Sequence, residues 1–534
     1  MSQIAPDSHT PSKPLGLVLM VQGTSSHAGK TTLVAALCRL FRNAGYRVAP
    51  FKAQNMSNNA AVTEDGLEVG RAQAMQATAA GVSVTVDMNP VLLKPQSDRT
   101  SQVVVLGKVW YTKDAVGYYA RKAELWPVVT GALDRLRALY DIVVAEGAGS
   151  PAEINLAQYD IVNMRVARYA NAPVLLVGDI ERGGVFAALF GTHALLQPEE
   201  RTLIKAFVIN KFRGDPSLLD PGFAMLEDRT GVPTIGVVPW WDLSHLPAED
   251  ALEWDELGRS AGAPALLDIA VMRLPRVANL DEFQPLAAEA GVRVRFVASP
   301  HDLGTPDLII VPGTKSTRAD LAWLRERGLA QAVIDHRAHG TPILGICGGF
   351  QMLGAQIVDI LGVELQGESV GLGLLPIRTT FDREKITRRV TARATGSHAL
   401  WRDDDDALGA SHELTGYEIH MGRTEVLDVA EMGSPPFFMR IGSTDVPEGL
   451  TSLDGLVVGT YMHGLLENRA LRQALLNTLA ARKGVVLPSS GKGLSVDQAV
   501  EALAASVAAN MDMAAVYNML GLPASLSELA DVSP

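Results

Sequence analysis

Short runs of β-branched and aliphatic residues recur along the chain and alternate with longer stretches in which apolar residues have helical spacing. This alternation predicts parallel sheets covered by helices on both faces, because parallel strands need a crossover connection that is usually a helix. In the first half the runs are 17–21, 48–51, 142–145, 174–177, 206–209 and 235–238. In the second half they are 267–272, 292–297, 308–311, 343–346 and 456–460. The sequence therefore predicts an α/β fold with doubly wound sheets.

The chain is too long for a single hydrophobic core. It has 534 residues, whereas single cores stop growing at about 250–300 residues. Residues 241–264 interrupt the alternation with prolines and an acidic cluster, which is typical of a linker. We therefore expect two domains, over 15–240 and 265–485, each with its own sheet.

The ends of the chain and one internal segment differ from the two domains. Residues 1–14 are mostly polar and rich in proline, and we expect a disordered tail there. Residues 486–534 are expected to form a C-terminal helical tail, and the alanine-rich helical pattern in 495–520 is expected to pack on the second domain. Residues 378–406 are strongly charged and end in four aspartates, which predicts a solvated loop.

The composition favours small-molecule chemistry. The chain has 47 basic and 59 acidic residues, a net charge of −12, and no basic cluster, which disfavours nucleic-acid binding. The N-terminal residues lack the pattern of a signal peptide, and no apolar stretch approaches the roughly 20 residues needed to span a bilayer. Two cysteines do not indicate a disulfide framework. We expect a cytoplasmic protein without a membrane partner. Whether it forms a homo-oligomer is left open by the sequence.

A phosphate-binding loop follows the first predicted strand. The segment Gly23-Thr24-Ser25-Ser26-His27-Ala28-Gly29-Lys30-Thr31-Thr32 leads from that strand into a helical pattern. Backbone N–H groups of such a loop and Lys30 can surround a polyphosphate, while the Thr31 hydroxyl reaches Mg²⁺. The predicted ATP-binding residues in this loop are Gly23, Thr24, Gly29, Lys30, Thr31 and Thr32.

A glycine-framed thiol occurs in the second half. Cys347 lies in Gly345-Ile346-Cys347-Gly348-Gly349-Phe350-Gln351, at the end of an apolar run. Flanking glycines give a strand-to-helix corner the strained backbone and the space that a nucleophile needs. Cys38 instead lies among leucines at helical spacing, and we interpret it as a core residue.

The first domain resembles dethiobiotin synthetase and its relatives, which use ATP to activate a carboxylate-type group. The resemblance rests on the long spacing from Gly23 to Gly29-Lys30-Thr31 and on four later motifs, Phe51-Lys52, Glu146-Gly147-Ala148-Gly149, Asn210-Lys211 and Gly236-Val237-Val238-Pro239. It implies that Glu146 helps to hold Mg²⁺ and that Asn210 contacts the adenine. Without the resemblance, Glu146 could be a capping carboxylate and Asn210 a turn residue.

The second domain resembles the class I glutamine amidotransferases, which have a flavodoxin-like fold. The pattern Gly345-x-Cys347-x-Gly349-x-Gln351 resembles their nucleophile elbow, and His463 in Tyr461-Met462-His463-Gly464 lies where they place their histidine. The resemblance implies Cys347 as nucleophile and His463 as base. It also implies an oxyanion and glutamine site that includes Gly313, Gly348 and Gln351.

The second domain departs from that pattern at one position. Most class I members have a glutamate two residues after the histidine, and this chain has Leu465 there. His463 must therefore be oriented in another way, or the site works as a dyad.

Several stretches together resemble the cobyric acid synthase family, a branch of the amidotransferases that fuses both kinds of domain. They are Gln54-Asn55-Met56-Ser57-Asn58-Asn59, Gly70-Arg71-Ala72-Gln73-Ala74, Pro90-Val91-Leu92-Leu93-Lys94-Pro95, Asp179-Ile180-Glu181-Arg182-Gly183-Gly184-Val185-Phe186 and Tyr417-Glu418-Ile419-His420-Met421-Gly422. The resemblance implies ATP-dependent amidation of the b, d, e and g carboxylates of adenosylcobyrinic acid a,c-diamide, a corrinoid, with glutamine as nitrogen donor.

The corrinoid contacts are the least defined part of this interpretation. The candidates are Lys52, Asn55, Asn58, Arg71 and Arg182, although the asparagines and Arg182 could equally form turns. Two alternative functions stay open. One is a sister amidotransferase such as cobyrinic acid a,c-diamide synthase, and the other is a nucleotide-driven switch with a noncatalytic second domain.

Overall fold

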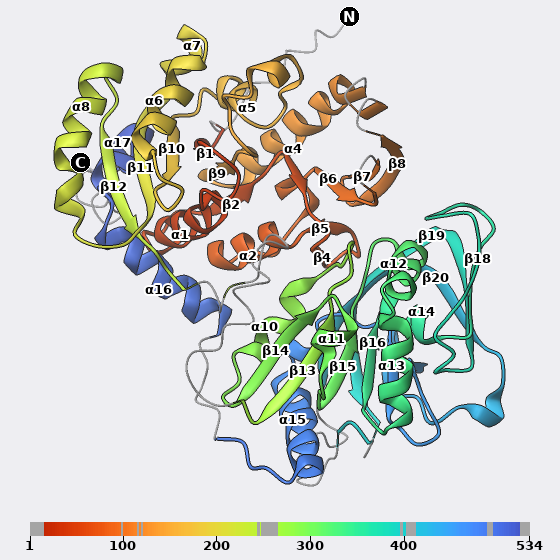
Figure 1. The fold of residues 1–534 in the computed structure, drawn as a ribbon. Coiled ribbons are helices and arrows are strands. Elements are labelled where there is room, and N and C mark those ends of the chain that lie inside the picture. Colours follow the sequence, from red (N-terminus) through yellow and green to blue (C-terminus); the bar gives the residue numbers. More distant parts are fainter. Residues whose placement is uncertain are drawn as a thin grey trace, which may run out of the picture.

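The computed structural model describes residues 15–97, 100–114, 117–118, 121–242, 246, 265–395, 399–401, 413–488 and 495–523. The predicted tail 1–14, most of the predicted linker 241–264 and the aspartates 403–406 lie outside these ranges. Figure 1 shows two α/β lobes, one from the first half of the chain and one from the second. Within the described ranges, no helix combines the length and the apolar character needed to cross a membrane.

The first lobe is built on a six-stranded parallel sheet in the order β12-β11-β10-β1-β9-β2. All the runs expected in this half form its strands. Their bounds are β1 Leu17–Gly23, β2 Val48–Phe51, β9 Ile142–Glu146, β10 Val174–Asp179, β11 Ile204–Phe212 and β12 Thr234–Pro239. The fold class predicted for this lobe is confirmed.

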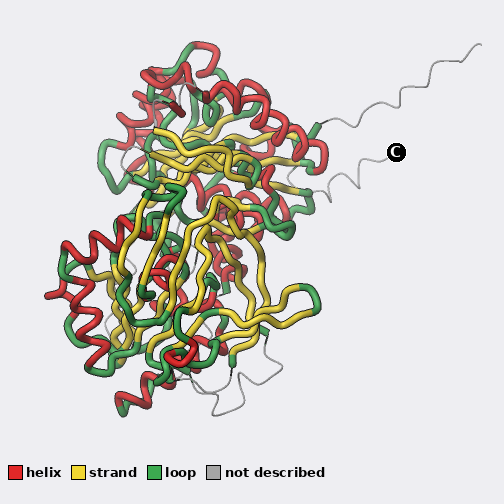
Figure 2. The backbone as a smooth tube through the Cα atoms, turned by 90° about the vertical axis from the view of Figure 1, so that its right-hand side faces the viewer, coloured by secondary structure: helices red, strands yellow, loops and turns green. Residues whose placement is uncertain are grey.

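Alternate residues of β1 enter two different cores, as expected for a strand with period-two side chains. Val18 and Met20 pack with one set of helices, and Leu19 and Val21 pack with another. The first set is α4 (Trp126–Leu139), α5 (Met164–Ala170), α6 (Val185–Leu195) and α8 (Asp220–Thr230). The second includes α1 (Lys30–Asn43) and α2 (Arg71–Ala80). Figure 2 shows the strands of both lobes flanked by helices.

The second lobe has a sheet in the order β14-β13-β15-β16-β24-β23, parallel except for β23. The runs predicted in this half are confirmed as β13 Leu267–Met272, β14 Val292–Val297, β15 Leu308–Val311, β16 Ile343–Ile346 and β24 Val457–Thr460. The short edge strand β23 is Leu450–Thr451. Helices α12 (Thr317–Glu326), α13 (Leu329–Ala338), α14 (Gly348–Leu353) and α15 (Arg469–Lys483) follow these strands.

The charged segment after residue 377 is not a solvated loop. Residues Ile377–Ala394 form the long strand β19, which pairs antiparallel with β20 (Leu414–Val426). Thr379, Phe381 and Val390 are buried in this strand while the charged residues between them are less buried, so the segment is one half-buried strand. The many charged residues of this segment led us to predict a loop, although buried residues recur among them.

Smaller sheets complete the two lobes. In the first lobe, β3 (Gln54–Met56), β6 (Val91–Pro95), β7 (Thr100–Val105) and β8 (Lys108–Asp114) form one sheet, and β4 (Ala60–Val62) pairs with β5 (Glu68–Gly70). In the second lobe, β17 (Gln356–Asp359), β18 (Gly367–Val370), β21 (Phe437–Ile441) and β22 (Thr444–Glu448) join β19. Ala60 and Val62 of β4 pack on Tyr417 and Ile419 of β20, so an apolar contact joins the lobes.

The C-terminal tail packs on the first lobe, so its expected place on the second lobe was wrong. Helices α16 (Val496–Ala509) and α17 (Met513–Leu520) share a core with α1, and Figure 1 shows both against that lobe. Arg39 of α1 forms an ion pair with Glu501 at 2.9 Å, and the Asp512 N–H donates to the Ile235 carbonyl at 2.7 Å. The apolar face of α16 therefore packs in the core that lies between α1 and the sheet of the first lobe.

We expect Leu503→Asp to destabilise the first lobe by at least about 3 kcal/mol, because a buried side chain is lost and a carboxylate is buried in its place. Leu503 is buried in the core shared with α1. Thermal unfolding with and without ATP measures the effect. Ala505→Asp is the control, since Ala505 lies on the exposed face of the same helix. Equal stability of the two variants would contradict the packing of the tail.

Candidate active sites

The predicted phosphate loop lies between β1 and α1. Gly29, which precedes α1, has a left-handed backbone with φ 88°, and a Cβ there would come within 2.0 Å of the Asn210 amide nitrogen. The Lys30 ammonium donates to the carbonyls of Ser25 at 2.9 Å and Gly149 at 3.2 Å. The cation thus lies inside the loop, where a polyphosphate would replace these carbonyl contacts.

Glu146 ends β9 beside this loop, as predicted, and only 1% of it is exposed. Its Oε1 accepts from the Thr31 hydroxyl at 2.8 Å and from the Lys52 ammonium at 2.7 Å. Its Oε2 accepts from the Gln76 amide at 2.6 Å. Four side chains from different elements therefore meet at the entrance to α1.

The pair Thr31 and Glu146 fits a Mg²⁺ ion. Mg²⁺ is usually bound through one or two protein oxygens, with substrate phosphates and water as the other ligands. One carboxylate and one hydroxyl, 2.8 Å apart and next to a phosphate loop, match that donor set. Among the described residues there is no cluster of three or more acidic, histidine or cysteine side chains that would form a dedicated metal cage.

The other predicted nucleotide residues also line this loop. The Thr24 N–H donates to the Val177 carbonyl at 2.9 Å, and the Thr32 hydroxyl donates to the Gly29 carbonyl at 2.9 Å. The Asn210 amide donates to the Ala28 carbonyl at 2.9 Å. Asn210 therefore supports the loop from β11, and an adenine contact stays a prediction.

Cys347 is a strained residue between β16 and α14, as expected for a nucleophile elbow. Its backbone angles are φ 51° and ψ −107°, a region that non-glycine residues rarely adopt. A Cβ on Gly349 would come within 1.8 Å of the Val311 carbonyl oxygen, and one on Gly348 within 2.8 Å of Thr314. The glycines therefore let the corner pack tightly against the end of β15.

His463 follows β24 and lines the same pocket as Cys347, whose thiol donates to the Ile419 carbonyl at 3.6 Å. Burial lowers the pKa of His463, but the charges of Glu282 and Cys347 outweigh this effect and raise it to about 10. An imidazole beside a thiol is the usual arrangement of a cysteine nucleophile and its base. The predicted oxyanion residue Gly313 is also close, because a Cβ there would lie 3.0 Å from the His463 ring and 3.7 Å from the Cys347 Cβ.

A pocket opens beside Cys347 and His463 and is lined by residues of both lobes. The predicted glutamine residue Gln351 forms part of its wall, held by the hydroxyls of Thr317 at 3.1 Å and Tyr461 at 3.2 Å. Its charged lining residues are Lys94, Lys315, Glu364 and Lys385. Burial lowers the pKa of Lys315 to about 7 and raises that of Glu364 to about 7. Cations and a carboxylate in one pocket suit a zwitterionic amino acid.

The comparisons with known proteins cover both sites. Residues 19–252 match the family described as CobQ/CobB/MinD/ParA nucleotide binding domain, and 268–471 match the CobB/CobQ-like glutamine amidotransferase domain. A protein named cobyric acid synthase from Sorangium cellulosum is 51% identical over 520 residues, which is 95% of this chain and 99% of that protein. The chain belongs to the cobyric acid synthase family. Another family member, from Dehalococcoides mccartyi, is 48% identical over 94% of this chain and 98% of its own length.

The corrinoid candidates of this cobyric acid synthase family member do not form one cluster. Lys52 is engaged by Glu146 in the phosphate site. Asn55 is buried and donates to Gln73 at 3.1 Å, whereas the side-chain oxygen of Asn58 is buried without a partner among the described residues. Arg71 contacts Asp281 at 2.6 Å, in the other lobe, and the half-exposed Arg182 lies 3.7 Å from Asp179. Corrinoid contacts of these residues stay predictions.

Sequence reasoning missed one residue at the thiol site of this cobyric acid synthase family member. The carboxylate that meets His463 belongs to Glu282, which lies 181 residues earlier in the chain. No local spacing connects the two residues. The available signal was an acidic pair, Asp281-Glu282, in the connection between two strands of the sheet that also carries Cys347 and His463.

Proposed function

We propose that the protein is a glutamine-hydrolysing cobyric acid synthase. It would use ATP and glutamine to amidate the b, d, e and g carboxylates of adenosylcobyrinic acid a,c-diamide, giving adenosylcobyric acid. The observation that carries the proposal is the 51% identity over 520 residues, because a match over 95% of the chain spans both lobes. The geometry of the two sites gives each half of the reaction a chemical basis.

The thiol site supplies ammonia. The Cys347 thiolate attacks the side-chain amide carbon of glutamine and forms a C–S bond, while N–H groups at Gly348 and next to Gly313 hold the oxyanion. The leaving nitrogen takes a proton from His463 and departs as ammonia. Water, deprotonated by His463, then attacks the thioester carbon, so that glutamate leaves and the thiolate is restored.

The phosphate site activates the carboxylate. A carboxylate oxygen of the corrinoid attacks the γ-phosphorus of ATP, ADP leaves, and ammonia then displaces phosphate from the acyl phosphate. Lys30 lies where it would bind the transferred phosphoryl group. Thr31 and Glu146 would hold Mg²⁺, which when bound neutralises charge on the phosphoryl oxygens.

Direct contact between the lobes supports transfer of ammonia between the two sites. Lys94 of β6, in the first lobe, lines the pocket beside Cys347. Lys94 contacts the buried Glu68 at 2.6 Å, and Glu68 also pairs with Lys385 of the second lobe. We infer that released ammonia stays within this interface until it meets the acyl phosphate. Use of ATP and glutamine, with two free cysteines, fits a cytoplasmic location.

The test is mass spectrometry of adenosylcobyrinic acid a,c-diamide after incubation with the protein, ATP, Mg²⁺ and amide-¹⁵N glutamine. We expect one labelled amide at each of the b, d, e and g positions, added stepwise. A parallel incubation uses cobyrinic acid, the substrate of the sister enzyme. Hydrolysis of glutamine with labelling of cobyrinic acid alone would favour that enzyme. ATP turnover without any glutamine hydrolysis would favour the nucleotide-driven switch.

A further inference from the structure

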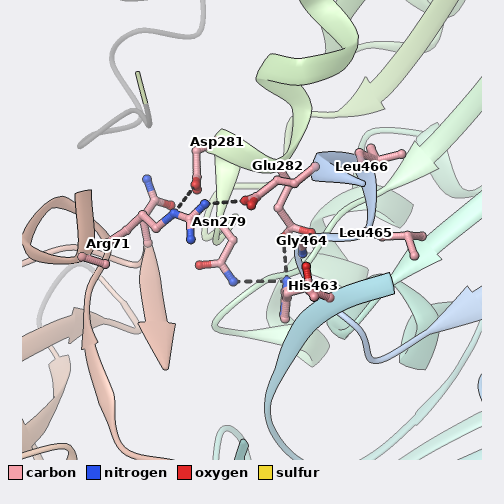
Figure 3. A network of polar contacts seen from close by, with 12 residues as sticks. Arg71, Asn279, Asp281, Glu282, His463, Gly464, Leu465 and Leu466 are labelled. Atoms are coloured by element: carbon pink, nitrogen blue, oxygen red, sulfur yellow. Dashed lines mark hydrogen bonds and ion pairs between the residues drawn. The ribbon is translucent and has the colours of Figure 1, made fainter. Parts of the chain in front are cut away.

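The ring of His463 is held by a buried carboxylate. Its Nδ1 lies 2.6 Å from Oε1 of Glu282, and the second carboxylate oxygen accepts from the Gly464 N–H at 3.2 Å (Figure 3). Both side chains are 2% exposed. A buried carboxylate with two donors has a fixed orientation, and it fixes the ring that it contacts.

This contact decides which ring nitrogen faces the sulfur. A carboxylate accepts a hydrogen bond, so Nδ1 carries a proton and Nε2 is left for Cys347. Tyr417 stacks on the ring at 5.3 Å between centroids, whereas the Asn279 amide nitrogen, 3.2 Å from Nδ1, is itself a donor and cannot bond the protonated Nδ1. The ring is therefore constrained at its edge and on its face.

The segment that carries Glu282 is held by the first lobe. The Ala60 N–H donates to the Asn279 side-chain oxygen at 2.9 Å, and the Leu280 N–H donates to the Asn59 side chain at 3.3 Å. Arg71, at the start of α2, contacts Asp281 at 2.6 Å (Figure 3). It also pairs with Glu467. The lobe that binds the nucleotide thus holds the residue next to Glu282.

We propose that Glu282 is a positioning residue that orients His463 toward Cys347, and that the first lobe keeps Glu282 in place through the ion pair between Arg71 and Asp281. Class I amidotransferases usually have a glutamate where this chain has Leu465. Here a carboxylate in the connection between β13 and β14 takes its place. This inference rests on the proposed glutaminase function. It adds that the orientation of His463 during glutamine hydrolysis depends on contact with the nucleotide-binding lobe.

The first test replaces Glu282 by glutamine and measures hydrolysis of glutamine in the full-length protein with ATP present. We expect kcat to fall roughly 10²- to 10⁴-fold with KM changed only a few-fold, because a misoriented base affects the chemical step. Glu289→Gln is the matched control. It breaks an ion pair in the same lobe, with Arg472 at 2.8 Å, in which the Glu289 side chain is 8% exposed.

A second readout distinguishes positioning from general damage to the fold. Glu282 and Cys347 interact directly with His463. Arg71, Asp281 and Glu467 face the stacked Tyr417, Lys385 faces Cys347, and the nearby His420 is neutral. Loss of the Glu282 charge lowers the pKa of His463, so the step in the pH profile of Cys347 alkylation by iodoacetamide that reports loss of the imidazolium should move to lower pH in Glu282→Gln than in the wild type. Glu282→Asp, which keeps the charge, should shift this profile less.

The contribution of the first lobe is tested by Asp281→Asn. We expect kcat for glutamine hydrolysis to fall roughly 2- to 30-fold, as for other residues that couple two sites indirectly. The control is Glu64→Gln, which breaks an exposed pair between the lobes, 3.9 Å from Arg389. Equal rates in Asp281→Asn and the wild type would overturn this part of the proposal.

The outcomes separate this inference from the proposed function. Wild-type protein that hydrolyses no glutamine would refute the proposed function. Wild-type hydrolysis with an unchanged kcat and alkylation profile in Glu282→Gln would refute the positioning role alone. A loss of activity of the same size in Glu289→Gln would also refute it, because burial of an unpaired partner would then explain both variants.

Discussion

Replacing Cys347 by alanine is expected to reduce glutamine-dependent amidation by at least about 10³-fold, because no other group can form the thioester. Amidation with free ammonia should continue, since the phosphate loop lies in the other lobe and does not use the sulfur. The measurement is the rate of amide formation with each nitrogen source, at a pH where enough ammonia is unprotonated. Cys347 acts as the proposed nucleophile only if the glutamine-dependent rate falls while the ammonia-dependent rate is retained.

The control for this variant is Cys38→Ala. Cys38 is fully buried in the core between α1 and the first sheet, and burial raises the pKa of its thiol far above the usual range. We expect both nitrogen sources to work in this variant at rates close to those of the wild type. Loss of the ammonia-dependent rate in Cys347→Ala would contradict the division of labour between the lobes.

Lys30→Ala is expected to reduce amidation strongly with both nitrogen sources. The ammonium is the one cation that the loop itself supplies to the transferred phosphoryl group, and loss of one such donor typically lowers kcat roughly 10²- to 10³-fold. Side-chain removal deletes the contacts to Ser25 and Gly149 but leaves the buried set around Glu146 intact. The measurement is ADP release and amide formation under saturating ATP.

The control for Lys30 is Lys205→Ala, an exposed lysine on β11 of the same sheet. We expect Lys30→Ala to retain hydrolysis of glutamine, because Cys347 and His463 are untouched. Amide formation at the wild-type rate in Lys30→Ala would show that the loop does not bind the phosphoryl group that reacts. Together with Cys347→Ala, this variant assigns each half-reaction to one lobe.

The parallel sheets could be predicted from the sequence because both faces of each strand are buried. A run such as Ile343–Ile346 is then continuously apolar and stands out from its surroundings. The antiparallel strand β19 could not be found in this way. It is exposed on one face, and its buried residues Thr379, Phe381 and Val390 are separated by charged ones.

The candidate sites were predictable where the chemistry is local. The phosphate loop and the Cys347 elbow each lie within about ten residues, and glycines mark their tight turns. Glu282 was not predictable from spacing because it reaches His463 through the fold of the sheet, 181 residues away. The placement of α16 was also missed, since an apolar helix face shows that the helix is covered but not which lobe covers it.

The return of α16 and α17 to the first lobe affects the order in which the protein can fold on the ribosome. The last strand of the first sheet ends at Pro239, and α16 begins at Val496, so the second lobe is synthesised in between. At about 5–20 residues per second, that interval is on the order of 10–50 s. During it the nascent first lobe lacks the apolar side chains that α16 adds to its core, among them Val500, Leu503 and Val507. We therefore expect the first lobe to expose apolar surface, of the kind that chaperones bind, until α16 has been synthesised.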